Sequence, residues 1–325
     1  MLSTALANQS TQKNNIGLPA NGTKRKRKKG KYNLFLMVLP FLALCFVFSY
    51  LPLYGWIYSL FDWKPGYSLS SSEFVGLYWF KEFLFDAGQR DTVIQVLQNT
   101  FAISGLNILT SVLPMFFAIF LTEVKTGWYR RVVQTLTTIP NFISWVLVYS
   151  FAFQLFKSDG LVNTLLQSFH LSHDAIQFLG DDTYVWLTMT LWSLWKGLGW
   201  SAIMYLAAIS GIDQELYEAA RVDGAGRFRM MWNITLPGIL PTFFILLLLG
   251  IANFLNNGMD QYFVFQNALN QDKIQVLDLY VYNIGMGSGS YSMATAIGII
   301  KSLVSLALLL SVNGLSKVVR GQSII

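Results

Sequence analysis

The chain has 325 residues, of which 54% are hydrophobic and only 12% are charged. Soluble domains contain about 25% charged residues, so this composition excludes an ordinary soluble protein and predicts an all-α, polytopic membrane protein. The formal net charge is +6, and a single cysteine, Cys45, excludes an intrachain disulfide.

Residues 1–31 are polar and contain a basic run, KRKRKK, at residues 24–29. We predict a disordered, basic cytoplasmic tail here. The apolar stretch that follows, residues 32–60, is long enough to cross a bilayer and has no clear small-residue cleavage site. It is therefore predicted to be a first transmembrane helix and not a signal peptide. Beside a membrane span, the basic run favours an orientation signal and contact with anionic lipid over nucleic-acid binding.

Five further apolar stretches are each roughly the twenty residues that a bilayer core requires. They predict transmembrane helices at about residues 94–121, 132–156, 183–208, 237–255 and 290–310. With the first helix, this gives six spans in one transmembrane domain, residues 32–325. The predicted external loops are residues 61–91, 157–182 and 256–289, the last with a short helix near residues 273–283.

The distribution of Lys and Arg supports this topology. Sixteen of the 23 basic residues fall on the side of the two termini and of the loop between the fourth and fifth spans. Five fall in the opposite loops, and the other two, Lys196 and Lys301, lie within spans. Because basic residues concentrate in cytoplasmic loops, both termini are predicted to be cytoplasmic.

A polar, basic island of about twenty residues, 218–237, separates the fourth and fifth spans. It has the pattern E-A-A, three residues, Gly, nine residues and I-x-L-P. The seven fixed positions are Glu218, Ala219, Ala220, Gly224, Ile234, Leu236 and Pro237. The alternative interpretation is an ordinary cytoplasmic loop with amphipathic helices. The agreement of spacing, helix caps and membrane context favours the specific pattern over that alternative.

The residues of this loop also predict its local structure. Ser210 and Asp213 fit a capping-box start, S-x-x-D, and Gly224 suits the left-handed position that ends a helix. Glu218 can pair with Arg221 or offer its carboxylate to a partner. A second short helix is predicted at residues 226–232. Four residues with i, i+3, i+4 and i+7 spacing share one helix face, and its alanines leave that face shallow enough for a partner to approach closely. They are Leu216, Ala219, Ala220 and Asp223.

The pattern at residues 218–237 resembles the coupling loop of permease subunits in binding-protein-dependent ABC importers. The resemblance implies a type I ABC importer permease fold in the bacterial cytoplasmic (inner) membrane. Its core would cover about residues 94–310, and its cytoplasmic coupling loop residues 210–237. The resemblance assigns ATPase coupling to the seven fixed positions together with Leu216 and Asp223. Pro237 is expected in the first turn of the next span.

The resemblance also implies the partners. They are a second, homologous permease subunit, a cytoplasmic ATPase dimer, an extracytoplasmic solute-binding protein, the oligosaccharide substrate and the membrane lipid. ATP and Mg would be bound by the partner ATPase, so no cofactor is expected in this chain. No nucleic acid is expected as a partner.

Two stretches, residues 195–226 and 279–305, resemble permeases for complex oligosaccharides. The most specific resemblance is to the first permease subunit of an importer of alginate or similar uronate-bearing oligosaccharides. Polar and aromatic groups at span depth are candidates for the sugar path, because burying them is unfavourable without a function or a partner. These candidates are Trp192, Lys196, Asn253, Asn256 and Asn257.

Alternatives stay open for these groups. The asparagines could instead form hydrogen bonds between helices, and Lys301 could be paired or could extend to the membrane surface. Lys196 and Lys301 would attract an anionic sugar. The predicted outer loops, however, contain twelve acidic and only five basic residues. Charge therefore leaves open whether the sugar is anionic.

No P-loop, zinc-protease or serine-hydrolase motif is present in the sequence. We therefore predict no catalytic residue and no metal site. A secondary sugar transporter would usually need an acidic residue deep in a span, and none lies deep in a predicted span. A non-transporting membrane scaffold is an alternative that the sequence leaves open. The main prediction is a non-enzymatic permease subunit of an ATP-driven oligosaccharide importer.

Overall fold

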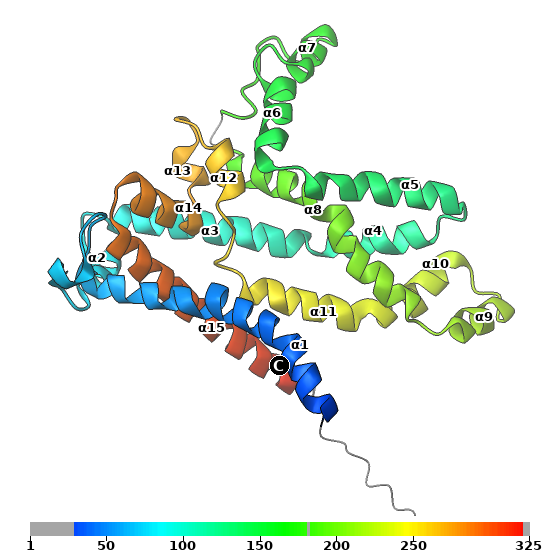
Figure 1. Cartoon of the computed structure of the whole chain (residues 1–325). Helices are drawn as coiled ribbons and strands as arrows, with labels where there is room; N and C mark the ends of the chain where they lie inside the picture. The colour runs from blue at the N-terminus through cyan, green and yellow to red at the C-terminus, as the bar shows by residue number, and fades with distance from the viewer. Residues whose placement is uncertain (1–28, 181–182, 321–325) are drawn as a thin grey trace, which may run out of the picture. The chain divides into compact units, whose positions relative to one another are not determined.

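The computed structural model describes residues 29–180 and 183–320, and the described chain is mostly helical, as predicted (Figure 1). It divides into two compact units, residues 1–54 and 55–325. Most of the predicted N-terminal tail, residues 1–28, lies outside the described residues.

In the first unit, α1 (Lys29–Cys45) continues into a π-helical turn, η1 (Phe46–Tyr50). A 3₁₀ helix, η2 (Leu51–Leu60), follows and runs past the boundary between the units. Together, residues 35–60 are long and apolar enough to cross a membrane. Their large apolar side chains are mostly exposed in the isolated chain, as expected of a helix surrounded by lipid. This agrees with the first predicted span.

The second unit begins with a small, irregular region. The strand β1 (Phe61–Asp62) pairs antiparallel with β2 (Glu73–Phe74), and Phe61 lies opposite Phe74. A 3₁₀ turn, η3 (Leu69–Ser71), lies between the strands, and α2 (Tyr78–Phe85) follows them. This region corresponds to the first predicted external loop.

The second predicted span is formed by two helices, α3 (Arg90–Thr110) and α4 (Val112–Thr122). They count as one apolar stretch of 33 residues that could cross a membrane. The break falls at Ser111, three residues before Pro114. A proline cannot donate the helical hydrogen bond of the preceding turn, so an interruption near it is expected.

The prediction of one continuous third span at residues 132–156 is wrong. The structure has α5 (Gly127–Thr138), a 3₁₀ turn, η4 (Ile139–Phe142), and α6 (Trp145–Phe156). The two helical arms are bent by 106°. Pro140 lies in the turn, and the Ser144 hydroxyl caps the new helix by accepting a hydrogen bond from the Leu147 N–H at 3.4 Å. A short helix, α7 (Leu161–Ser168), then lies inside the predicted second external loop.

The long helix α8 (Val185–Ser210) is central to the second unit. It packs against α3, α4, α5 and α11 (Leu236–Ala252). It lies very close to α5 at Gly199, where an added Cβ atom would lie 2.4 Å from the Thr137 main chain. Glycine at this position therefore allows two helix backbones to touch.

Between α8 and α11 lie α9 (Gln214–Val222), α10 (Arg227–Met230) and a π-helical turn, η5 (Met231–Thr235). The predicted second short helix thus begins as expected, but the prediction that it ends at residue 232 is wrong. It continues through η5 into α11, and residues 227–252 form one apolar helical stretch. The π-turn ends two residues before Pro237, whose missing N–H removes a regular helical hydrogen bond.

After α11 come α12 (Asp260–Phe265), α13 (Gln271–Ile274), α14 (Leu277–Tyr282), a π-turn, η6 (Asn283–Gly287), and α15 (Tyr291–Arg320). The single short helix predicted near residues 273–283 is therefore two helices, separated at Gln275 and Val276. The last helix extends ten residues past the predicted end of the sixth span, to Arg320. It packs against α11, α2 and α14.

Four helical stretches among the described residues are long and apolar enough to cross a membrane, or five if the bent pair α5–α6 is one span. The helix α8 is long enough but is not among them. It contains several Trp, Ser and Thr residues and Lys196, which are less apolar than Leu and Ile. The count of six spans therefore stays a prediction.

Candidate functional site

The predicted coupling loop contains a separate short helix, α9, beyond the ends of α8 and α11 (Figure 1). Asp213 is its N-cap, and the carboxylate accepts a hydrogen bond from the Glu215 N–H at 3.0 Å. The predicted capping-box start at Ser210 is wrong. Ser210 is the last residue of α8, and its hydroxyl donates to the Leu206 carbonyl at 2.9 Å. Serine bonds this way when the carbonyl of the preceding turn is within reach.

Gly224 ends α9 as predicted. Its φ is +73°, a conformation that favours glycine because it has no Cβ atom. The Ala225 N–H donates to the Ala220 carbonyl at 2.8 Å, and the Gly224 N–H donates to the Arg221 carbonyl at 3.1 Å. These two bonds form a Schellman motif, so α9 is closed at both ends by its own sequence.

The four residues of the predicted α9 face differ in exposure. Leu216, Ala219 and Asp223 are exposed, whereas Ala220 is half-buried. No residue of α9 is buried. The predicted pairing of Glu218 with Arg221 is not formed, since the ion pairs in the described part of the chain are Lys157–Asp159 and Lys301–Asp278. The exposed side of α9 thus offers a leucine, a small alanine and free charges.

A hydrogen bond connects α9 to the next membrane helix. The hydroxyl groups of Tyr217 and Thr235 are 2.9 Å apart, and Thr235 is buried. The last three motif positions follow, with Ile234 and Leu236 half-buried and Pro237 exposed. This hydrogen bond therefore connects α9 directly to η5, at the start of α11.

The three predicted path asparagines lie together just past α11. Asn257 donates to the Ser104 hydroxyl at 2.9 Å, and Ser104 donates to the Phe254 carbonyl at 2.5 Å. Asn253 donates to the Leu249 carbonyl in the last turn of α11. Asn256 is exposed, and its amide has only long contacts with the described residues, 3.4 Å to the Asn253 side chain and 3.5 Å to the Ser305 hydroxyl. Of the three amides, that of Asn256 has the weakest hydrogen bonds within the chain.

Two cavities adjoin this cluster. The first has a volume of about 240 Å³ and is bounded by all three asparagines. The second, about 330 Å³, is lined by Trp200, Ser201 and Tyr205 among others. Both are lined by Ser111, Leu246 and Leu247, so they lie next to each other along α3, α4, α8 and α11.

Sequence reasoning missed several polar residues of these cavities. Ser104, Asn107 and Ser111 line the first cavity from the α3 side. Their i, i+3 and i+7 spacing places them on one helix face. This polar stripe within a predicted span was a signal that could have identified them. Trp200, which lines the second cavity, was not among the predicted path residues.

The other two path candidates have partners within the chain. Lys196 donates to the carbonyls of Asn141 at 2.7 Å and Pro140 at 3.1 Å, and its ammonium lies 5.4 Å from the Trp145 ring centre. Trp192 is half-buried in an aromatic cluster with Phe265. Neither lines the two cavities. Both assignments to the path stay predictions.

Lys301 has an acidic partner that the sequence did not indicate. Its ammonium donates to the Asp278 carboxylate, and the two side chains are only 15% and 18% exposed. The other oxygen of Asp278 accepts a hydrogen bond from the Gly258 N–H at 2.8 Å. The pair therefore joins α15, α14 and the segment that follows the asparagines, and pairing of Lys301 accounts for its presence in a span.

Comparison with known families gives a match over most of the chain. The model for the binding-protein-dependent transport system inner membrane component matches residues 110–321. Protein LplB of Bacillus subtilis (strain 168) is 38% identical over 292 residues, which cover 89% of this chain and 90% of LplB. A polygalacturonan/rhamnogalacturonan transport system permease protein, YteP of the same organism, is 37% identical over 90% of this chain and 92% of its own length.

Solved structures give the same result. A chain in the crystal structure of a bacterial ABC transporter involved in the import of the acidic polysaccharide alginate has a TM-score of 0.78 and 31% identity. The match covers 90% of this chain and 97% of that one. A bacterial alginate ABC transporter in complex with an alginate pentasaccharide-bound periplasmic protein has a TM-score of 0.76, 29% identity and coverage of 91% and 98%. The predicted fold class is confirmed.

Proposed function

The chain belongs to the family of binding-protein-dependent transport system inner membrane components, and on this premise we propose how it works within an importer. It forms one half of the translocation path for an oligosaccharide, and a second, homologous permease forms the other half. A cytoplasmic ATPase dimer, which binds ATP and Mg, engages α9. A binding protein delivers the sugar at the opposite face of the membrane.

The observation that supports coupling most directly is the construction of α9. It is capped by Asp213, closed by the Gly224 motif, and has no buried residue. A short isolated helix is marginal in water, so the two caps help to keep α9 helical although none of its residues is buried. Its exposed face is free for a partner, and Tyr217 joins it to the start of α11. ATP binding would act by favouring one arrangement of the two permeases over the other.

Substitution of Ala219 tests this proposal. Ala219 is exposed, whereas the half-buried Ala220 would also disturb packing within the chain. Ala219→Trp should overpack a closely fitted contact by about 1–3 kcal/mol, which is roughly 5- to 150-fold in ATPase affinity. The measurements are co-purification of the ATPase with the tagged permease and uptake into proteoliposomes.

Ala219→Ser is the matched control, because it keeps the side chain small, and it should retain both association and uptake. The yield of folded permease should be the same for both variants. Normal ATPase association and normal uptake in Ala219→Trp would remove α9 as the coupling helix.

The substrate we propose is a uronate-bearing oligosaccharide. Two similar proteins support this: the YteP relative is named for polygalacturonan and rhamnogalacturonan, and the solved transporter imports alginate. The path would run along the two adjoining cavities. There, the amides of Asn253, Asn256 and Asn257 can bind sugar hydroxyls, while the exposed face of Trp200 can stack on a sugar ring.

A further inference from the structure

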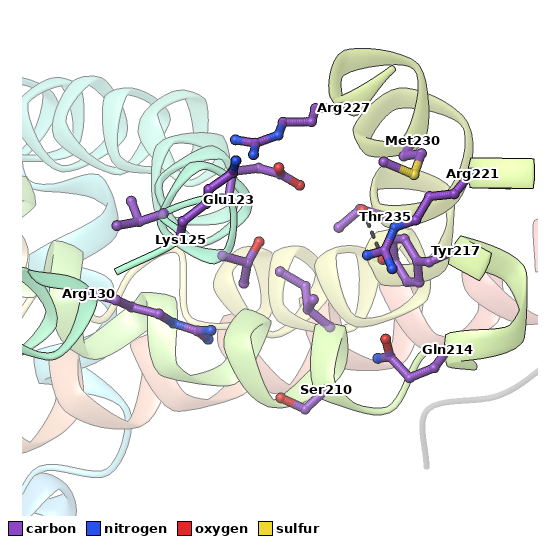
Figure 2. Close-up of a pocket in the computed structure, with 13 residues that line it drawn as sticks. Glu123, Lys125, Arg130, Ser210, Gln214, Tyr217, Arg221, Arg227, Met230 and Thr235 are labelled. Atoms are coloured by element: carbon purple, nitrogen blue, oxygen red, sulfur yellow. Dashed lines mark hydrogen bonds between the residues drawn. The ribbon is translucent and has the colours of Figure 1, made fainter. Parts of the chain in front are cut away.

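A third pocket lies away from the proposed sugar path, between the α4–α5 connection and the coupling loop (Figure 2). Its volume is about 650 Å³, within the usual range for small-molecule sites. Thr122, Lys125 and Arg130 line it from one side, and Tyr217, Arg221 and Arg227 from the other. It is thus bounded by the ends of two membrane helices and by α9 and α10.

The pocket has a strong excess of positive charge. Four cationic side chains line it, and Glu123 is its one acidic residue. In the described part of the chain, none of these four cations is in an ion pair, since both ion pairs there lie elsewhere. Figure 2 shows Arg130 and Arg221 directing their guanidinium groups toward the space between the loops from opposite sides. Like charges gathered in one concavity repel each other and attract an anion.

The hydrogen-bond donors of the cationic side chains that line the pocket fit a phosphate group. Guanidinium groups present a planar set of N–H donors that matches phosphate oxygens in a bidentate way. The pocket is also larger than one carboxylate needs, and Ile209, Val124 and Met230 add apolar surface to its lining. A phosphate ester with an apolar remainder is complementary to both parts.

The start of α5 favours a lipid as the source of that phosphate. Trp128 is 72% exposed and Tyr129 is 52% exposed, directly before Arg130. Exposed Trp and Tyr are typical of membrane–water interfaces. Basic pockets between transmembrane helices on the cytoplasmic side bind anionic lipid headgroups. The pocket therefore has the composition and the position of a headgroup site.

We propose that this pocket binds a phosphate group, supplied by the headgroup of an anionic phospholipid, between Arg130 and the coupling loop. The bound phosphate accepts hydrogen bonds from Arg130 on one side and from Arg221 and Arg227 on the other. It thereby links the α4–α5 connection to the loop that meets the ATPase. The amount of anionic lipid in the membrane then affects the position of the coupling loop, independently of the sugar.

Arg130→Gln and Arg131→Gln test the proposal as a matched pair. The two arginines are adjacent on α5 and both lie outside the coupling loop, but only Arg130 lines the pocket. The complete transporter is purified, and native mass spectrometry counts the phosphatidylglycerol molecules that it retains. The number of retained phosphatidylcholine molecules is the comparison. ATPase activity is measured in nanodiscs with increasing phosphatidylglycerol.

Wild type and Arg131→Gln should retain phosphatidylglycerol and respond to it, and Arg130→Gln should lose at least tenfold in retention. A second arm titrates inorganic phosphate into the same samples. Arg130-dependent binding of inorganic phosphate without retained lipid would support the phosphate site and identify a soluble source.

Two outcomes would overturn the proposal. The first is equal retention of lipid and equal phosphate binding in the two variants. The second is loss of the ATPase subunit from Arg130→Gln with no lipid or phosphate dependence, which would show an acidic ATPase surface in the pocket. Either result leaves the Ala219 test of coupling unaffected.

Discussion

At the residue scale, hydrogen bonds distinguish the three asparagines that we propose for the sugar path. Asn257 is held by Ser104, which also bonds the Phe254 carbonyl, so its amide stabilises the junction between α3 and the end of α11. Within the described part of the chain, the Asn256 amide has only contacts of 3.4 and 3.5 Å. An amide with weak internal bonds loses little when it exchanges them for a ligand. We therefore assign sugar binding to Asn256 before Asn257.

This assignment predicts a difference between two alanine variants. Asn256→Ala should leave the yield and thermal stability of the protein unchanged, but should lower the apparent affinity for the sugar by roughly three- to tenfold, because one hydrogen bond is lost. Asn257→Ala should instead lower the thermal stability, because the hydrogen bond between Asn257 and Ser104 is lost. Sugar-stimulated ATPase activity and thermal unfolding of the purified complex measure the two effects. Unchanged sugar affinity in Asn256→Ala would contradict the proposed path.

At the element scale, the angle between α5 and α6 depends on three residues. Pro140 interrupts the helix, Ser144 caps the next one, and Lys196 of α8 donates to the carbonyls of Pro140 and Asn141 in the turn. The Pro140 carbonyl also accepts a hydrogen bond from the Ile143 N–H at 3.2 Å, so Lys196 adds to the hydrogen bonds of a turn whose helical pairing is interrupted. The turn is fixed against α8 at the level where Gly199 meets Thr137.

Two glycines of α8 test this contact. Gly199→Ala would place a Cβ atom 2.4 Å from the Thr137 main chain, so the helices must separate. We expect a loss of about 1–3 kcal/mol in stability. Gly197→Ala, two residues earlier, meets nothing within 4 Å and should be neutral or slightly stabilising, since alanine favours the helix. Thermal unfolding in detergent compares them, and equal midpoints for the two variants would show that α8 and α5 are not in backbone contact.

At the scale of the whole molecule, the orientation that we propose puts α9 in the cytoplasm. The basis is the asymmetry of Lys and Arg between the two sides. In a Cys45→Ser background, Val222→Cys on α9 should resist a membrane-impermeant thiol reagent in intact cells. Asp174→Cys and Gln271→Cys, which are also exposed, should react.

Permeabilised cells are the control for this labelling. Val222 is 88% exposed, so its cysteine should react once the membrane is opened. Labelling of Val222→Cys in intact cells would reverse the proposed orientation and separate α9 from a cytoplasmic ATPase.

The sequence by itself determined the features that depend on neighbouring residues. Long apolar stretches predicted the membrane helices because the bilayer requires about twenty apolar residues for each crossing. Gly224 was predicted to end α9, and its φ of +73° confirms this, because a left-handed residue is a local requirement. The coupling pattern also identified the family, since its spacing lies within twenty residues of chain.

Only the tertiary structure decided which distant groups meet. Lys196 contacts carbonyls 55 and 56 residues away, Asn257 contacts Ser104 across 153 residues, and Lys301 pairs with Asp278 in another helix. Ser210 and Asp213 both suit a helix cap by residue type, and the end of α8 decided between them. A side-chain hydrogen bond acts over about 3 Å. Its partner is therefore set by how the helices pack, which no local pattern specifies.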